Sequence, residues 1–115
     1  MLDSDNRPWG RWEEYINEPS GYRVKRLIIN PGKRFSLQKH AHRNEHWVIV
    51  QGRGIVTINN KTWEVTAGDS LFIERGARHR LENSDEEKAL IVIEIQTGTC
   101  LEDDIIRLED DWGRS

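Results

Sequence analysis

The amino-acid sequence predicts an all-β sandwich or barrel formed by a single domain. Short runs rich in β-branched and aromatic residues recur at close, regular spacing along the chain. Clusters of Gly, Pro, Asn and Asp separate these runs, and no segment has a helical pattern longer than about two turns. At 115 residues the chain is long enough for one hydrophobic core and too short for two.

Turn residues bound each predicted strand. The polar residues 1–6 come first and are predicted to form a flexible tail. A proline and a glycine in residues 7–10 predict a turn into the first strand. Asn59-Asn60 predicts a tight hairpin, because Asn tolerates left-handed backbone conformations. The tail segment 103–108 is compatible with a short strand or a helical turn. The predicted strands are residues 12–16, 22–29, 34–40, 45–51, 54–58, 62–65, 70–73, 78–83 and 89–97.

Composition excludes several classes of protein. Apolar residues make up 36% of the chain and charged residues 32%, which is typical of a soluble globular protein and not of a disordered one. No apolar run is long enough to cross a membrane as a helix, and the N-terminus lacks the apolar core of a signal peptide. The single cysteine, Cys100, excludes an internal disulfide and fits a reducing compartment. We therefore expect a cytoplasmic protein without a membrane partner.

The charge is unevenly distributed along the chain. The formal net charge of −3 gives no general attraction to nucleic acid, so no nucleic-acid partner is expected. Residues 23–53 carry a cluster of Lys and Arg side chains, whereas the segment from Glu82 onward is strongly acidic. The basic cluster fits either a wall that binds a small anion or a solvated strand face, and the sequence leaves both open.

One short segment combines several side chains that bind metals. Three histidines, a glutamine and a glutamate lie within residues 38–46, and a fourth histidine, His79, follows a later turn. Imidazole nitrogens and a carboxylate from adjacent strands suit a divalent metal. Strand alternation puts Gln38 and His40 on one face, and His42 has the same parity but lies where the strand turns. Each histidine alone would more often be a core or surface residue, but the group favours a metal site.

Two spaced motifs in the chain resemble those of cupins. The first comprises Gly32, Gln38, His40, Glu45 and Gly52, with Gln in place of the family's first His. The second comprises Gly68, Glu74, Gly76, His79 and Asn83, with Glu in place of a usual Pro. Cupins hold a metal inside a double-stranded β-helix (jelly-roll) barrel, so the resemblance implies this fold for a single cupin domain over residues 1–115. It also implies one divalent metal ion, with zinc, manganese, cobalt, iron and nickel all open, held by Gln38, His40, Glu45 and His79.

A more specific resemblance covers residues 7–114, nearly the whole chain. Within this range the block at residues 38–47 and the segments 93–98 and 102–105 look like the cupin domain of type II phosphomannose isomerases. That domain usually forms the C-terminal part of bifunctional mannose-1-phosphate guanylyltransferase/mannose-6-phosphate isomerases. The resemblance implies a cytoplasmic enzyme of carbohydrate metabolism that interconverts mannose 6-phosphate and fructose 6-phosphate by enediol-type proton transfer. No glycine-rich nucleotide-binding segment precedes Arg7, so nucleotidyl transfer is expected to be absent.

Such an isomerase needs a proton-transferring base and cations for the phosphate, besides the metal. The candidate bases are Glu94, which alternates with apolar neighbours on its strand, and His42. The candidate phosphate-binding residues are Arg34, Lys25 and Arg43, because cationic side chains, and arginine's planar fork above all, suit phosphate oxygens. Arg34 has the same parity as the predicted metal ligands, so alternation predicts that it faces the cavity.

Two alternative functions and one assembly are also predicted. The first alternative is a non-catalytic, metal-containing cupin that binds a sugar phosphate, and the second is a cupin isomerase or epimerase of another sugar. A small domain gains stability by burying apolar chain ends against a second copy, so we expect a homodimer. The apolar residues near the chain ends are Trp9, Trp12, Ile105, Ile106, Leu108 and Trp112.

Overall fold

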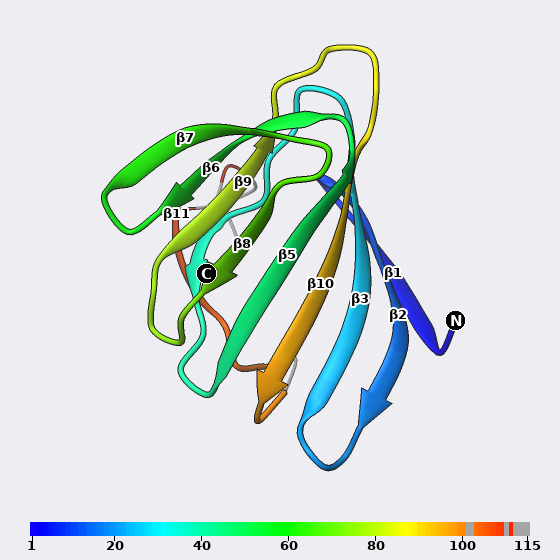
Figure 1. Cartoon of the computed structure of the whole chain (residues 1–115), viewed down its shortest axis with the longest axis vertical. Helices are drawn as coiled ribbons and strands as arrows, with labels where there is room; N and C mark the ends of the chain where they lie inside the picture. Colours follow the sequence, from blue (N-terminus) through cyan, green and yellow to red (C-terminus); the bar gives the residue numbers. More distant parts are fainter. Residues whose placement is uncertain (101–102, 110, 112–115) are drawn as a thin grey trace.

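Eleven antiparallel strands form two sheets in the computed structural model, which describes residues 1–100, 103–109 and 111 (Figure 1). The strands are β1 (Asp3–Arg7), β2 (Gly10–Glu18), β3 (Tyr22–Ile29), β4 (Leu37–Lys39), β5 (Arg43–Gln51), β6 (Arg53–Ile58), β7 (Lys61–Thr66), β8 (Ser70–Ile73), β9 (His79–Asn83), β10 (Leu90–Gly98) and β11 (Ile106–Glu109). One sheet has the order β1-β2-β3-β10-β5-β8 and the other the order β11-β4-β9-β6-β7. The predicted all-β class and the jelly-roll architecture are therefore confirmed. In the described residues, no helix is long and apolar enough to cross a membrane.

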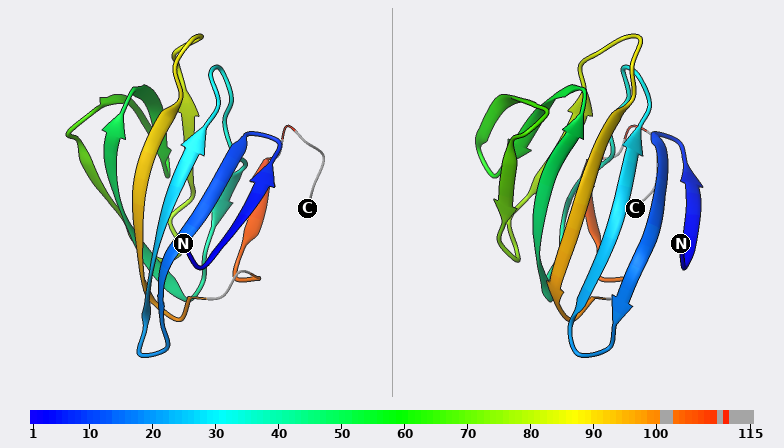
Figure 2. Two further views of the ribbon diagram at one scale, coloured as in Figure 1. Left: turned by 90° about the vertical axis from the view of Figure 1, so that its right-hand side faces the viewer. Right: turned by 45° about the vertical axis from the view of Figure 1, so that its right-hand side comes forward.

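The two sheets face each other and enclose the core (Figure 2). Phe35 lies at its centre, with its ring edge-on to Trp9 at 5.7 Å and to Trp47 at 5.8 Å between ring centroids. Val56 and Leu81 from the second sheet are fully buried against them. Each such side chain contributes roughly 1.5–3 kcal/mol by leaving water, so this packing holds the two sheets together.

The inward faces of three central strands change from apolar to polar along their length. β10 lies between β3 and β5, and Val92 of β10 is level with Leu27 and Ile49 on its neighbours. Two residues on, the inward residue of β10 is Glu94, and two further on it is Gln96. Alternation keeps all of these on one face. The barrel therefore has an apolar end and an end lined with buried polar groups.

Most predicted strands are confirmed, several at their predicted bounds. Residues 22–29 and 70–73 form β3 and β8 as predicted. The Asn59-Asn60 turn joins β6 to β7, and Asn59 has a positive φ of 54°. The ambiguous segment 103–108 contains the start of a strand, β11, which pairs with β4.

The strand predicted at residues 34–40 is shorter than expected. Only Leu37–Lys39 form β4, and Arg34 makes an isolated bridge to Glu82. Phe35 and Ser36 are both buried, with exposed fractions of 3% and 2%. An alternating strand buries only every second residue on one side, so the parity argument fails before residue 37.

The expected flexible tail at residues 1–6 is corrected by β1. Residues 3–6 of this segment pair with β2, and the Leu2 N–H donates to the Glu14 carbonyl at 2.7 Å. The two-residue turn at Pro8-Trp9 reverses the chain, and the buried Trp9 ring anchors it in the core. A short hairpin attached to a core aromatic gains packing that a free tail lacks.

The homodimer stays a prediction, and part of its basis was wrong. Trp9 and Trp12 are buried within their own chain, with exposed fractions of 7% and 8%, so they are not available to a second copy. Ile106 and Leu108 of β11 are exposed. Trp112 lies outside the described residues.

Candidate metal centre and its cavity

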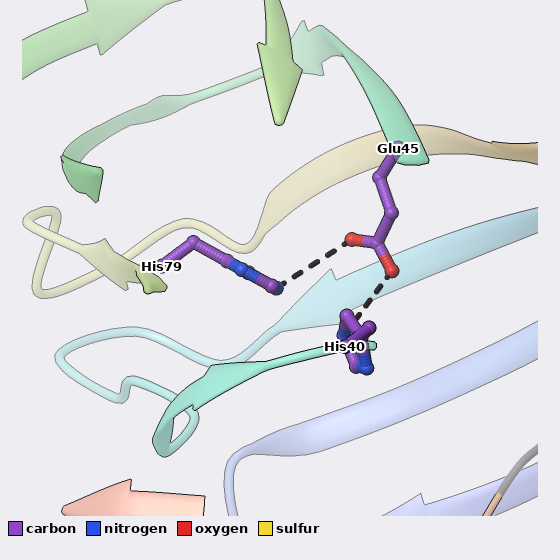
Figure 3. A group of neighbouring side chains, drawn as sticks. All are labelled: His40, Glu45 and His79. Atoms are coloured by element: carbon purple, nitrogen blue, oxygen red, sulfur yellow. Dashed lines mark ion pairs between the residues drawn. The ribbon is translucent and has the colours of Figure 1, made fainter. Parts of the chain in front are cut away.

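Two histidines and a glutamate converge at the polar end of the barrel (Figure 3). His40 follows β4, Glu45 lies on β5, and His79 begins β9. All three side chains are buried, and one donor atom from each lies within 4.8 Å of the others. The Glu45 carboxylate lies between the two imidazoles: Oε2 is 3.3 Å from His40 Nε2 and Oε1 is 3.6 Å from His79 Nε2.

Backbone carbonyls fix the tautomer of both histidines. His40 Nδ1 is 2.6 Å from the Asp104 carbonyl oxygen, and His79 Nδ1 is 3.0 Å from that of Ala77. A carbonyl oxygen only accepts, so each Nδ1 carries the proton and each Nε2 has a lone pair facing Glu45. His79 Nε2 is buried and has no hydrogen-bond partner among the described residues.

The protonation state of the histidines also suits a metal. Burial lowers the pKa of His40 to about 4, and the charge of Arg43 lowers it as well. Burial likewise lowers the pKa of His79 to about 4. Both imidazoles are therefore neutral at pH 7, as metal ligands must be. Two neutral imidazoles and one carboxylate with converging lone pairs fit a divalent metal with nitrogen and oxygen ligands.

Gln38 lies in the same region. It is level with His79 where β4 pairs with β9, it is half-buried, and it lines the cavity next to His40 and Glu45. Strand alternation thus brings Gln38 and His40 to the same cavity, as the sequence predicts. Its role as a fourth ligand stays a prediction.

Arg43 contacts both the carboxylate and one imidazole of this group. Its Nε donates to Glu45 Oε2 at 2.8 Å, and a terminal nitrogen lies 3.1 Å from His40 Nε2. Arg43 has the parity of Glu45 on β5 and is buried. The guanidinium therefore places a positive charge against the Glu45 carboxylate and the His40 lone pair, the same groups that a metal cation would contact.

A cavity of about 150 Å³ adjoins the cluster. Aromatic side chains, including Trp9, Trp12 and Trp47, form part of its wall. Its charged lining residues are Arg7, Lys25, Arg43, Glu45, Glu94 and Arg107. With Glu94 neutral, four cations and one carboxylate leave three positive charges. This balance favours an anionic ligand.

Glu94 is a buried carboxyl group whose pKa lies close to neutral pH. It is buried on β10 and lines the cavity. Burial, together with the charge of Glu45 and a hydrogen bond to it, raises the pKa of Glu94 to about 8. A carboxyl group that changes protonation near neutral pH can accept a proton and return it. Glu94 thus lines the polar part of the cavity, and its role as a base stays a prediction.

Two predicted site residues lie elsewhere. His42 is exposed and does not line the cavity, because β4 ends at Lys39 and the chain turns before β5. Arg34 forms a two-point ion pair with Asp111, at 2.7 and 3.0 Å, and lies outside the cavity. The irregular backbone at residues 34–36 removes the alternation on which its placement depended.

The other two predicted phosphate-binding residues do line the cavity. Lys25 is buried, with its Nζ 4.0 Å from the centroid of the Trp12 ring. A cation over an aromatic face is held in place by the ring quadrupole. Lys25 and Arg43 therefore place positive charge in the cavity wall, which is the first of the two interpretations that the sequence left open for the basic cluster.

Several lining residues were missed in the sequence. Gln96 shares the parity of Glu94, and this signal was available. Arg107 and Ile105 come from the tail and line the cavity only because the chain returns to β4. No local sequence pattern predicts that the tail pairs with β4.

Asp104 supports the His40 loop from the distant tail. Its carbonyl accepts from His40 Nδ1, and its carboxylate oxygens accept from the N–H groups of Ala41 and His42, both at 2.9 Å. Burial raises the pKa of Asp104, but the two backbone hydrogen bonds outweigh this effect, and the pKa lies below its ordinary value. The carboxylate therefore fixes the loop that carries His40.

The Asp104→Ala variant is expected to bind metal roughly 10–100-fold more weakly, because a group that orients a ligand contributes about this much. The variant loses the carboxylate hydrogen bonds to the N–H groups of Ala41 and His42. The loop can then move, and the His40 ring is no longer held in the orientation that the metal needs. A metal titration with a competing chelator measures the change. The exposed neighbour Asp103 supplies the matched control, Asp103→Ala. Equal metal affinity in both variants would contradict the orienting role.

Comparison with known proteins gives a consistent picture. The family model described as "Mannose-6-phosphate isomerase C-terminal" matches residues 3–110. The mannose-1-phosphate guanylyltransferase of Klebsiella pneumoniae is 49% identical over 109 residues, which cover 94% of this chain and 23% of that protein. The chain thus spans less than a quarter of this relative's length.

Solved structures agree on the fold. The Schizosaccharomyces pombe Cnp3 cupin domain superposes with a TM-score of 0.73 at 17% identity, covering 77% of this chain and 64% of that one. The capsular polysaccharide assembling protein CapF from Staphylococcus aureus superposes with a TM-score of 0.79 at 21% identity. This match covers 95% of this chain and 34% of CapF. At these identities the likeness establishes the cupin fold alone.

Proposed function

Because the chain belongs to the mannose-6-phosphate isomerase C-terminal domain family, we propose that it is a metal-dependent isomerase of mannose 6-phosphate and fructose 6-phosphate. The observation that carries the proposal is the arrangement of three kinds of group around one cavity. His40, Glu45 and His79 converge as a metal-binding cluster, Glu94 titrates near neutrality beside them, and cations line the wall. An aldose–ketose isomerase needs these three.

His40, Glu45 and His79, with Gln38 as a possible fourth ligand, would hold the metal. A divalent metal bound there would act as a Lewis acid towards the carbonyl and hydroxyl oxygens of the sugar. The donor set is compatible with zinc, manganese, cobalt, iron or nickel. The fixed tautomers of the two histidines keep both Nε2 lone pairs available for it.

Cationic side chains would bind the phosphate. Lys25 and Arg43 are buried, and Arg107 enters the cavity from β11. The lining keeps a surplus of positive charge even when Glu94 is ionised, and this favours a dianion over a neutral sugar. An unphosphorylated sugar should therefore bind much more weakly than its 6-phosphate.

Glu94 would transfer the carbon-bound proton. As a carboxylate, it would accept the proton from C2 of mannose 6-phosphate. The electrons of the C–H bond then form a C1–C2 double bond, and the π electrons of the C1 carbonyl move to O1, which gives an enediol-type intermediate. It then returns the proton to C1, while the hydroxyl proton moves from O2 to O1, which gives fructose 6-phosphate. Burial is the main cause that raises the Glu94 pKa, and it keeps Glu94 basic enough to take a carbon-bound proton.

A coupled assay tests the proposed function. Metal-loaded protein is expected to convert mannose 6-phosphate to fructose 6-phosphate, and the same protein stripped with a chelator is not. Glucose 6-phosphate and unphosphorylated mannose serve as substrate controls. If the protein binds metal and mannose 6-phosphate but converts neither mannose 6-phosphate nor glucose 6-phosphate, it is a sugar-phosphate-binding cupin and not an isomerase. Turnover of another sugar alone would assign it to a different isomerase or epimerase.

A further inference from the structure

Gln96 lines the cavity with an unsatisfied hydrogen-bond acceptor. Its side chain is buried, with an exposed fraction of 1%. Its Oε1 atom has no hydrogen-bond partner among the described residues. A buried amide oxygen without a partner costs free energy, and most such oxygens in native proteins are paired. An unpaired acceptor in the wall of a cavity therefore points to a donor supplied by a ligand.

The neighbours of Gln96 are engaged with other groups. Gln96 is level with Arg23 of β3 on one side and Glu45 of β5 on the other. Arg23 forms a buried ion pair with Glu14, and Glu45 accepts from Arg43. The amide thus projects inward at the polar end of the barrel, beside the metal-binding cluster and two residues from Glu94.

The chemistry of this oxygen narrows the kind of ligand group that it can bind. An amide oxygen only accepts hydrogen bonds, and so do the oxygens of a phosphate dianion. The hydroxyl groups of a sugar can donate. We propose that Gln96 binds a hydroxyl group of the sugar substrate, accepts its hydrogen bond, and so helps to decide which sugar the cavity accepts. This inference rests on the proposed function, because that function supplies a polyol ligand next to the metal-binding cluster.

A glutamine that binds substrate and a glutamine with a purely structural role should respond differently to substitution. A structural glutamine stabilises the ligand-free protein, so its loss lowers the melting temperature. An acceptor that is unpaired until substrate binds does not stabilise that state, so its replacement by an apolar side chain of similar length should not lower it. A site that binds a hydroxyl also discriminates against analogues that lack it.

The test uses the metal-loaded protein and mannitol 1-phosphate, the reduced form of mannose 6-phosphate, which has no carbonyl and cannot isomerise. Wild type, Gln96→Met and Gln51→Met are compared. Gln51 lies exposed on β5 and donates to the Ala89 carbonyl, so it is a matched control outside the cavity. The measurements are the metal content, the melting temperature without ligand, and the dissociation constants of mannitol 1-phosphate and its monodeoxyfluoro analogues. Fluorine keeps the size of a hydroxyl but cannot donate.

We expect wild type to bind one fluoro analogue roughly tenfold or more weakly than the parent, which is the loss of one well-placed hydrogen bond. Gln96→Met should bind mannitol 1-phosphate more weakly than wild type does, by a similar factor. It should no longer discriminate against that analogue, and its metal content and melting temperature should equal those of wild type. Gln51→Met should match wild type throughout.

Four results would overturn the inference. Wild-type affinity in Gln96→Met excludes the contact with the substrate. A lower melting temperature, with all analogues weakened equally, makes Gln96 structural. If Gln96→Met does not fold, equal wild-type affinity for every fluoro analogue is sufficient to reject the contact. If wild type neither binds mannitol 1-phosphate nor isomerises mannose 6-phosphate, the proposed function itself fails, and the inference with it.

Discussion

Replacing His79 with alanine is expected to remove the bound metal and to lower isomerase turnover roughly thousandfold or more, since a Lewis-acid metal supplies several kcal/mol and each 1.36 kcal/mol is a factor of ten. His79 is almost completely buried, and its Nε2 lone pair faces Glu45 with no other partner among the described residues. The remaining ligands of the cluster come from one segment of the chain, His40 and Glu45. They lose the imidazole that faces Glu45 from the second sheet.

Metal content after gel filtration and turnover of mannose 6-phosphate measure the two effects together. His46→Ala is the matched control, because His46 is an exposed histidine on the outer face of β5, with its ring tilted against that of Phe72. It should keep both metal and turnover. A His79→Ala protein that retains stoichiometric metal would remove His79 from the ligand set.

The Glu94→Gln variant is expected to lower kcat/KM about 10²–10⁴-fold, the usual contribution of a positioned general base, while metal content stays unchanged. Glutamine has the size of glutamate and can donate the same hydrogen bond to Glu45, but it cannot accept a proton from carbon. The pH dependence of kcat/KM gives a second measurement. Its acidic limb should lie below the metal-free Glu94 pKa of about 8, because a cation at Glu45 offsets the charge that raises this pKa.

The same substitution should change the stability of the metal-free protein in a defined pH window. The pKa of Glu94 is raised to about 8 in the folded protein, against an ordinary value of 4.5. Its stabilising contribution is therefore fully present below the unfolded value and is lost as pH rises through the folded one. His40 and His79 act in the opposite direction, since their lowered pKa values reduce stability as pH falls below 6.5.

Urea unfolding of chelated protein from pH 6.5 to 8 isolates the Glu94 effect. Wild type should lose stability across this range, and Glu94→Gln should lose much less. His42→Ala tests the other candidate base predicted from the sequence. We expect it to keep the acidic limb of the rate profile. If His42→Ala loses this limb and Glu94→Gln keeps it, the role belongs to His42.

Alternation along intact strands made part of this site predictable. β5 and β10 run without interruption through the polar end, so the parity of Glu45 and of Glu94 could be counted from the sequence. The spacing of the two cupin motifs implied His40 and His79 in the same way. Where the backbone is regular, a residue's face follows from its number.

The failed predictions lie where this regularity stops. Arg34 precedes two consecutive buried residues, and His42 follows the end of β4, so counting by twos no longer gives the face. Asp104 and Arg107 were not foreseen for a different reason. Their places depend on β11 pairing with β4, a long-range contact that the local pattern of the tail does not specify.

The hydrogen bond between Asp104 and His40 joins positions that are 64 residues apart. Coupling free energies are reciprocal, so whatever the docked tail adds to metal affinity, the metal adds to the docking of the tail. A 10–100-fold effect on metal affinity corresponds to about 1.4–2.7 kcal/mol in both directions. If the site holds a metal as proposed, metal loss would loosen the strand that supplies Arg107 to the cavity. The metal ion and the wall that would hold the phosphate would then form a single cooperative unit.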